Sequence, residues 1–446
     1  MATAYIHRTT GTAFTSNQKF TASAWIKGVI PPAADRFIFN IGEASGSANS
    51  VFFYIANTGD LILYGYNPTL QLITDMRLRD PSAWYHIVLA VDTTQGTPAD
   101  RNKVYINGVQ ITSFSSETNF GSSDTLGALA SGKIQYIGSD TGGGSSWDGA
   151  MSHVQYVDGL QLAPTEFGEV DSTSGIWKIK TSCYATPGNN GYCLKMEDSS
   201  NLDLDSSSNA HTFTTVDEIS ATKDSPSDNF CVWSKNNPQA ASLASFLYGA
   251  TMIITNADST ERSTYGSLAN STGKYYMEAL CAAVGGVSYI GVLGTQQQLA
   301  ADTNFKTQSL GYAYRSSDGE KINNNTGAAY GSTYTTGDYM GMAFDITNGT
   351  IWFSKNGVWQ NSATIGEIAA GTTTNAAFSG MTIGANQFYA PTVCGHTSQR
   401  WKANFGNGVF ASTAVTSPGT NASGIGIFEY DVPTGFTAWS TKGFNV

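Results

Sequence analysis

Apolar and polar residues alternate through many short segments of this chain. The pattern is clear in "SVFFYIA" (50–56), "DLILYGY" (60–66) and "WYHIVLAVD" (84–92), and it returns in "DYMGMAFDI" (338–346). A period of two residues indicates β-strands that bury one face. Turn formers recur at close spacing between these segments, which favours antiparallel sandwiches over a parallel α/β sheet. The sequence therefore predicts an all-β fold.

Two distant segments share one hairpin pattern. "KVYINGVQ" carries Asn107 and Gly108 between alternating apolar residues, and "IWFSKNGVWQ" carries Asn356 and Gly357 in the same setting. Asn-Gly accepts positive φ at both central positions of a two-residue type I′ turn, so each segment predicts a tight β-hairpin. Because 446 residues exceed what one hydrophobic core usually serves, we expect two antiparallel β-sandwiches that share this device.

The middle of the chain has a different pattern. Turn formers are dense there and alternation is lost, as in "ATPGNNGY" and "KDSPSDNF". Pro and Asn at this density mark irregular chain or a domain boundary. We therefore expect a first sandwich over 1–165, a turn-rich connector over 166–245, and a second sandwich with a C-terminal extension over 246–446.

Two of the five cysteines, Cys183 and Cys193, flank a turn in the expected connector and could pair. An odd number of cysteines without a secretory leader favours thiols made in a reducing compartment. Spacing alone does not give the geometry that a disulfide needs. The sequence leaves both states open.

Composition removes several classes of function. Charged residues make up 13% of the chain, the net charge is −11, and no basic run is present. Nucleic-acid binding depends largely on Lys and Arg, so we expect no nucleic-acid partner. No stretch approaches the 18 or more apolar residues of a membrane span, so we expect no membrane insertion. Aromatic residues at 12% supply ample surface for folded cores.

An ordered series of segments resembles two known families. "AWYHIVLAVDTTQGTPADRNKVYINGVQITSF" and the later "YIGSDTGGGSSWDGAMSHVQYVDGLQLAPTEFGE" resemble the laminin-G-like branch of the concanavalin-A-type jelly rolls. "TGKYYMEA", "LGYAYRSSDGEKINNN", "GDYMGMAFDITNGTIWFSKNGVWQ" and "RWKANFG" resemble a SPRY domain. The connector and the ending "DVPTGFTAWSTKGFNV" resemble segments of tailed-phage virion proteins. The connector departs from that pattern at Ser207 or Ser208, where glycine is expected, and in its cysteines.

The resemblance implies a structural protein of the virion. A tail fibre or surface fibre made in the host cytoplasm would contact other virion proteins and present sandwich loops to a host-surface glycan or receptor. Fibres are usually trimers, so the resemblance implies a homo-oligomer and favours a trimer. The sequence has no heptads, so sandwich faces or a partner protein would have to hold such a trimer together.

The sequence lacks the common catalytic motifs. The chain contains no GxSxG, P-loop, HExxH or GxGxxG motif. Jelly-roll glycosidases need paired carboxylates, and the nearest string has only Glu169 and Asp171, without the last acid. We therefore expect a protein that is not an enzyme and that needs no cofactor.

Two groups of residues are candidates for ligand binding. Asp140, Trp147 and Asp148 lie in the glycine-rich stretch "GSDTGGGSSWDG", where the carboxylates could hold calcium and the indole could stack on a sugar. Tyr64 and Tyr66 share one face of an expected strand and could form a sugar platform. Ordinary turns with a buried Trp, and ordinary packing of the tyrosines, are the simpler alternatives.

Four functions remain open. The first is a virion fibre or surface protein that attaches to the host. A passive capsid-decorating protein without a ligand, a jelly-roll glycoside hydrolase, and a cellular SPRY adaptor are the alternatives. The missing acid pair weighs against the hydrolase, and the absence of RING or coiled-coil segments weighs against the adaptor.

Overall fold

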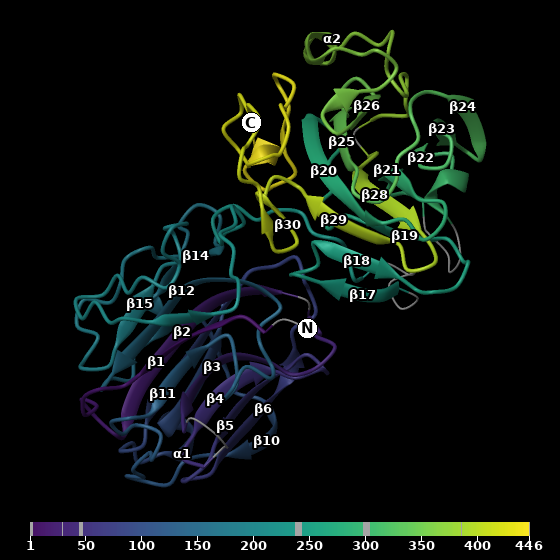
Figure 1. The fold of residues 1–446 in the computed structure, drawn as a ribbon. Helices are drawn as coiled ribbons and strands as arrows, with labels where there is room; N and C mark the ends of the chain where they lie inside the picture. Colours follow the sequence, from purple (N-terminus) through teal and green to yellow (C-terminus); the bar gives the residue numbers. More distant parts are fainter. Residues whose placement is uncertain are drawn as a thin grey trace. The chain divides into compact units, whose positions relative to one another are not determined.

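The computed structural model describes residues 3–28, 30–43, 48–236, 243–297, 304–384 and 386–445. Of these residues, 41% lie in strands and 4% in helices, which confirms the all-β fold. The chain forms two compact units, residues 1–221 and 222–446 (Figure 1).

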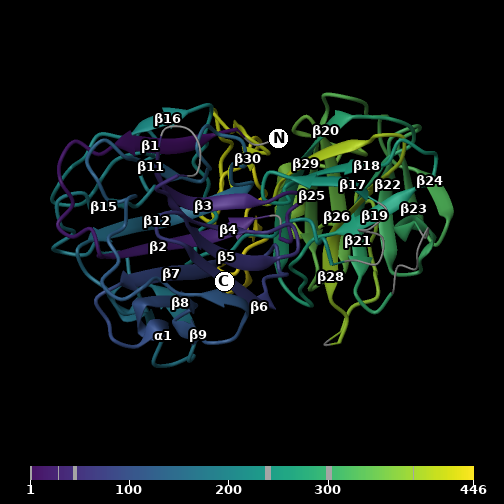
Figure 2. The ribbon, with the colours of Figure 1, turned by 90° about the horizontal axis from the view of Figure 1, so that it is seen from below.

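The first unit is a two-sheet sandwich, and each sheet is antiparallel (Figure 2). In its described part, one sheet has eight strands, in the spatial order β10 (Phe114–Thr118), β6 (Leu70–Arg77), β5 (Asp60–Gly65), β4 (Val51–Ile55), β3 (Arg36–Gly42), β11 (Ile134–Ile137), β1 (Tyr5–Thr9) and β16 (Thr214–Val216). The other has six, in the order β15 (Tyr192–Leu194), β12 (Gly149–Asp158), β2 (Lys19–Gly28), β7 (Tyr85–Asp92), β8 (Asn102–Ile106) and β9 (Val109–Ile111). A short helix, α1 (Pro98–Arg101), precedes β8.

Alternation along the strands builds the core between these sheets. Val51, Phe53 and Ile55 of β4 are buried, while the residues between them are half-exposed. On the facing sheet, Ala24 and Ile26 of β2 belong to the same apolar cluster. Because each fully buried large aliphatic side chain contributes about 1.5–3 kcal/mol, the period of two fixes which face of each strand enters the core.

The outer face of the six-stranded sheet is covered by chain that follows it. Val88 and Val157 point away from the main core and pack on Phe167, which comes just before the hairpin of β13 (Gly168–Val170) and β14 (Trp177–Ile179). Nearby, Trp25 and His86 are register partners on β2 and β7, and their rings stack 4.7 Å apart. A polar side chain on this face also holds the covering chain. Gln155 of β12 accepts a hydrogen bond from the backbone N–H of Tyr184.

The expected connector is divided between the two units. Residues 166–221 belong to the first unit, where β15 pairs with β12 and β16 pairs with β1, and residues from 222 onward belong to the second. The sequence predicted a separate segment over 166–245. The strands β15 and β16 have only three residues each, and among so many turn formers they show no clear alternation. Their pairing comes from long-range contacts with strands that are far away in the sequence.

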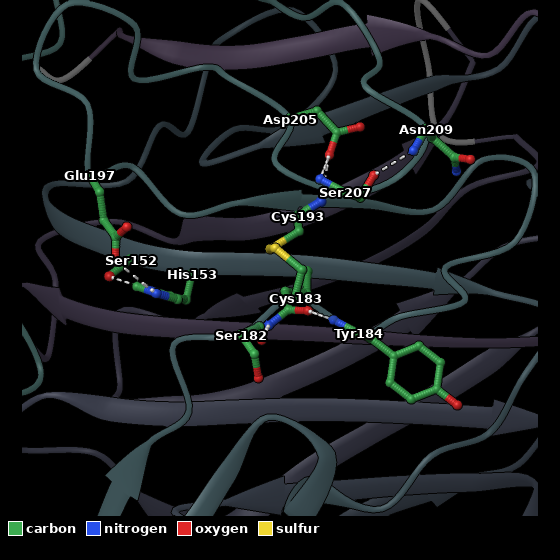
Figure 3. The surroundings of a disulfide bond; sticks show 11 residues. Ser152, His153, Ser182, Cys183, Tyr184, Cys193, Glu197, Asp205, Ser207 and Asn209 are labelled. Carbon is green, nitrogen blue, oxygen red and sulfur yellow. Dashed lines mark hydrogen bonds and ion pairs between the residues drawn. A yellow bond between two sulfur atoms is a disulfide. The ribbon is translucent and has the colours of Figure 1, made fainter.

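The structure joins Cys183 and Cys193 by a disulfide, with Cα atoms 5.8 Å apart (Figure 3). Cys193 lies on β15 and is buried, and the bond ties the loop at Cys183 to that strand. The carboxylate of Asp205 accepts a hydrogen bond from the backbone N–H of Cys193 at 2.9 Å, which fastens the next turn as well. Of the two states that the sequence left open, the structure therefore shows the paired one. The thiols of Cys231, Cys281 and Cys394 are buried.

The second unit is also a two-sheet sandwich. In its described part, one sheet contains β17 (Leu243–Leu247), β18 (Met252–Thr255), β29 (Arg400–Asn404), β20 (Lys274–Ala283), β25 (Tyr339–Asp345), β26 (Thr350–Lys355) and β27 (Val358–Trp359), with β32 (Thr437–Ala438) parallel to β20. The other contains β19 (Arg262–Tyr265), β28 (Tyr389–Gly395), β21 (Tyr289–Gly294), β22 (Gly311–Arg315), β23 (Glu320–Asn323) and β24 (Thr326–Ala329). Smaller elements are η3 (Phe305–Thr307), α2 (Ile365–Ala370), β30 (Val409–Phe410) and β31 (Thr413–Ala414).

The C-terminal extension covers the outer face of the sheet that contains β20. Phe428 and Phe436 pack there on Tyr276 and Trp352. The buried carboxylate of Glu278 accepts hydrogen bonds from the backbone N–H groups of Glu429 and Tyr430, at 2.8 and 2.9 Å. Burial raises the pKa of Glu278 to about 7, against the lowering effect of these bonds. The extension is thus a third layer of the second unit.

His86 gives the first unit a defined dependence on pH. Trp177 Nε1–H donates to Nδ1 of His86 at 3.0 Å, so the proton of the neutral ring is on Nε2, which lies 2.9 Å from the Ser23 hydroxyl. Burial lowers the pKa of His86 to about 3. The unfolded chain therefore binds one more proton than the folded unit between about pH 6.5 and pH 3. Stability from this group is present above pH 6.5 and is lost as the pH falls.

We expect the free energy of unfolding of the first unit to fall below pH 6.5 by up to about 1.4 kcal/mol per pH unit from this residue. The measurement is denaturant unfolding at several pH values, with hydrogen exchange of residues 84–111 reporting on this unit. His86→Gln, which can still donate and accept, serves as the control and should lack this component. An identical pH slope in both proteins would contradict the prediction.

Candidate functional site

Five aromatic side chains form a continuous surface on the outer side of the eight-stranded sheet. They are Phe37 from β3, Phe52 and Tyr54 from β4, Tyr64 from β5, and Tyr66, which directly follows β5. We call this surface the aromatic face. Its members alternate along each strand with core residues, so the strand period that buries one side places these rings on the other. Tyr66 is 38% exposed and the other four are half-buried.

The rings of the aromatic face support one another. Phe52 and Tyr64 are register partners on neighbouring strands, and their rings stack with centroids 5.7 Å apart. Phe37 stacks on Tyr54 at 4.9 Å, and Tyr64 lies 4.8 Å from Tyr66. Cross-strand aromatic pairs stabilise a sheet by about 0.2–1 kcal/mol each. The face is therefore preformed, with little side-chain entropy left to lose on binding.

Tyr54 and Tyr64 of this face are neutral hydrogen-bonding groups. Burial raises the pKa of Tyr54 to about 12, and the neighbouring Tyr66 raises the pKa of Tyr64. Their hydroxyls therefore remain protonated at neutral pH and can both donate and accept. Flat rings with hydroxyl edges suit a ligand with apolar faces and polar edges, such as a sugar ring.

Sequence reasoning found only part of this face. Tyr64 and Tyr66 were predicted, and the structure places them together. Phe37, Phe52 and Tyr54 were missed, although "VFFYI" alternates in the same way as "LILYGY". What the sequence does not give is the register that sets β4 beside β5 and β3 beside β4.

The structure corrects the expectation for Trp147. Its side chain is 8% exposed and belongs to the core of the first unit, and its indole N–H donates to the backbone carbonyl of Ala150 at 3.2 Å. The ring is therefore not available for stacking on a ligand. Asp140 shares the loop, and its carboxylate accepts a hydrogen bond from the backbone N–H of Gly144 at 2.7 Å, which closes the turn.

A calcium ion at Asp140 and Asp148 would have no third acidic side chain as a ligand. Within the described ranges, no three His, Cys, Asp or Glu side chains gather closely enough to hold a metal ion.

The same part of the chain has no helix that is long and apolar enough to cross a membrane.

The two acids considered for glycoside hydrolysis lie on the β13–β14 hairpin. Glu169 and Asp171 both pair with Lys178, at 3.2 and 3.3 Å. Backbone N–H groups of Ser174 and Thr173, together with Lys178, lower the pKa of Asp171. A glycosidase needs one carboxylic acid with a raised pKa, and the pKa of Asp171 is shifted in the opposite direction.

A serine, a histidine and a glutamate also lie in line near the disulfide (Figure 3). The Ser152 hydroxyl is 2.8 Å from Nδ1 of His153, and Nε2 of His153 is 3.4 Å from the Glu197 carboxylate. Ser152 and His153 are adjacent on β12, where the register shifts and His153 has φ of 47°. These contacts, with the bond from the His153 N–H to the Lys195 carbonyl, fasten residues 195–197 to the strand.

Both predicted Asn-Gly turns are covered by an aromatic ring from further along the chain. Asn107 and Gly108 have φ of 49° and 80°, as a type I′ turn requires, and Asn356 and Gly357 have 48° and 79°. A Cβ atom on Gly108 would lie 2.6 Å from the ring of Trp177, and one on Gly357 would lie 2.5 Å from the ring of Tyr430. Glycine is therefore required at Gly108 and at Gly357 for two reasons. The backbone has positive φ there, and the aromatic ring leaves no space for a Cβ atom.

Comparison with known families assigns a family to each unit. Residues 2–162 match the model of the Concanavalin A-like lectin/glucanases superfamily, and residues 274–408 match the SPRY domain. The chain therefore carries a concanavalin A-like domain of the laminin-G type, followed by a SPRY domain.

Similarity to individual proteins covers short segments. The chain is 31% identical over 104 residues to a Ran-binding proteins 9/10 homolog of Drosophila melanogaster, which is 23% of this chain and 11% of that protein. It is 31% identical over 86 residues to human Ran-binding protein 9, which is 19% of this chain and 12% of that protein. The matched part of this chain thus spans about a tenth of the length of these relatives.

Two solved structures are similar at the level of single domains. The SPRY domain of human HERC1 aligns with 20% identity and a TM-score of 0.26, over 34% of this chain and 86% of that one. A heptameric SAP-like pentraxin from Limulus polyphemus aligns with 20% identity and a TM-score of 0.26, over 36% and 72%.

Replacing Gly108 with Val should lower the free energy of unfolding of the first unit by roughly 1–3 kcal/mol, because a β-branched residue resists positive φ. Gly132→Val is a matched control, since Gly132 has φ of 83° but a Cβ atom added there would have no neighbour within 4 Å. Denaturant unfolding should show a larger loss for Gly108→Val, because of the Trp177 ring. Equal losses would show that the ring contact adds nothing.

The second unit offers the same comparison. Gly357→Val should lose more stability than Gly337→Val, because Gly337 has φ of 93° and a Cβ atom there would have no neighbour within 4 Å, whereas Gly357 meets Tyr430. Limited proteolysis should also cut the C-terminal extension faster in Gly357→Val. An extension that stays protected would contradict the role given to Tyr430.

Proposed function

We propose that this protein is a non-enzymatic attachment protein that binds a glycan of the host surface through the aromatic face. The observation that carries the proposal is the set of five partly exposed rings that contact one another on the outer side of the first sandwich. Such a face offers area for stacking and hydroxyls for orientation.

The setting that we propose is the virion of a tailed phage, as a tail fibre or surface fibre made in the host cytoplasm. Support comes from the resemblance of residues 166–245 and of the C-terminal ending to segments of phage virion proteins. The pairing of a concanavalin A-like domain with a SPRY domain is compatible with this setting. A passive capsid-decorating protein is the competing proposal, and it predicts no glycan binding.

The second unit has a separate proposed role in contact with other proteins. The relatives matched in part are named Ran-binding proteins, which favours a protein partner for a SPRY module. In a virion the partner would be another structural protein or a second copy of this chain. A trimer would meet this need and would also multiply the aromatic faces.

Single contacts between the face and a sugar should be weak, near millimolar or about −4 kcal/mol. Useful attachment therefore depends on many copies, because linked sites raise the effective concentration. The test is to display the protein on beads and to measure adhesion to susceptible and resistant bacterial cells, with and without competing soluble glycan extracted from each.

We expect Tyr64→Ala and Tyr66→Ala together to reduce bead adhesion at least about tenfold, since truncating central aromatic residues usually removes most binding energy. Tyr248→Ala is the matched control, because Tyr248 is 44% exposed but lies on the second unit. Adhesion should be selective for susceptible cells and unchanged in the control. Adhesion that survives loss of both tyrosines would reject the aromatic face as the binding surface.

A further inference from the structure

A pocket of about 480 Å³ lies in the second unit between β23 and the chain that follows α2. Tyr312, Lys321 and Asn323 line one side. The other side consists of residues 373–374 and 376–381. Ligand pockets in proteins usually span about 300–1,000 Å³, so this volume suits one or two sugar rings.

The direction of the side chains on β23 follows from its register. Ile322 packs with Phe305 and Ala313 in an apolar cluster on one side of the sheet. Residues that alternate along a strand point to opposite sides, so Lys321 and Asn323 point to the other side, with Tyr312, the register partner of Asn323. The pocket thus receives two polar side chains from a regular strand.

Lys321 brings a positive charge to this pocket. Its Nζ atom lies 5.6 Å from the centroid of the Phe378 ring and 6.0 Å from that of Tyr330. Among the described residues it makes no ion pair, in contrast to Lys274, which lies over the ring of Phe436 but also pairs with Asp345 at 3.4 Å. Partial burial lowers the pKa of Lys321, which is the effect expected of an ammonium held away from water without a counter-ion.

The remaining lining is neutral and mixed. Thr373, Thr374 and Ser379 are exposed and bring hydroxyl groups to the rim, while Ala376, Ala377 and Met381 are buried behind it. Lys321 is the only charged residue of the lining in the described part of the chain. In a protein of net charge −11, an isolated cationic pocket selects for a ligand with a negative charge.

We propose that this pocket binds an acidic sugar, with its carboxylate on the Lys321 ammonium and its hydroxyls on the threonine and serine side chains. A phosphate group would favour a bidentate arginine or several backbone N–H donors, and the lining contains no arginine. A single carboxylate needs only one ammonium, and the exposed hydroxyl groups of the rim suit the hydroxyls of a sugar ring. This site lies on a different unit from the aromatic face and does not depend on the function proposed for that face.

The test is calorimetric titration of the full chain with methyl glucuronide, with methyl glucoside as the uncharged probe. We expect the glucuronide to bind with a millimolar Kd, and at least about tenfold tighter than the glucoside. Raising NaCl from about 0.05 to about 0.5 M should weaken glucuronide binding, because salt screens the charge pair. No detectable binding, or equal binding of both sugars, would overturn the proposal.

Variants locate the site and separate it from the aromatic face. Lys321→Met keeps the length and the ring contacts of the side chain, and it should reduce glucuronide affinity at least about tenfold. Lys402→Met, a half-buried lysine of the same unit outside the pocket, is the matched control and should bind like the parent protein. Because Lys321 lies on the second unit, a loss of affinity in Lys321→Met assigns the binding to this pocket and not to the aromatic face. Unchanged affinity in a folded Lys321→Met variant, checked by circular dichroism, would overturn the assignment.

Two further probes distinguish other anions. N-acetylglutamate presents the carboxylate of a peptide side chain, and inorganic phosphate presents a phosphate. We expect both to bind at least about tenfold more weakly than methyl glucuronide, because neither presents several hydroxyls to the threonine and serine side chains. Tighter binding of either probe would replace the acidic sugar with a peptide carboxylate or a phosphate group.

Discussion

Every β-strand has two faces, and the core of a sandwich can receive only one of them. The rest of this structure depends on what happens to the other face. On the six-stranded sheet of the first unit, Phe167 and the β13–β14 hairpin cover it, with Phe167 on Val88 and Val157 and Trp177 on His86. On the β20 sheet of the second unit, the C-terminal extension covers it, held at Glu278. The outer side of the eight-stranded sheet keeps half-exposed rings, and that surface is the candidate site.

One small device fixes both covering segments in place. A type I′ turn with Asn and Gly leaves a position without a Cβ atom, and an aromatic ring lies directly against it in each unit. Trp177 does this at Gly108 and also bonds to buried His86. Tyr430 does this at Gly357, while its backbone N–H bonds to Glu278. The repeated turn is thus a docking point for chain that arrives later, in two domains from different families. The aromatic face and the Lys321 pocket lie away from these two turns. Each of these two sites can therefore be altered without changing the other site.

Sequence patterns determined the strands, the two sandwiches and the turns. The period of two in "VFFYI" and "LILYGY" marks which residues face the core, and Asn107-Gly108 and Asn356-Gly357 specify their turns because few other pairs accept that backbone. Tyr64 and Tyr66 could be predicted as one surface because they are two residues apart on one strand. These are local properties, and short-range sterics and burial suffice to set them.

Tertiary structure decided the features that depend on residues far apart in the sequence. Trp147 lies in a glycine-rich loop that resembles a binding loop, and only the packing of the first unit shows that its ring is buried. Residues 166–221 have the composition of a connector, yet long-range pairing makes them part of the first sandwich. The rings beside Lys321 come from Tyr330 and from Phe378, 57 positions further along the chain from the lysine (378 − 321 = 57). Register and long-range packing bring such groups together, and a single sequence carries the pattern of each strand but not the identity of its neighbours.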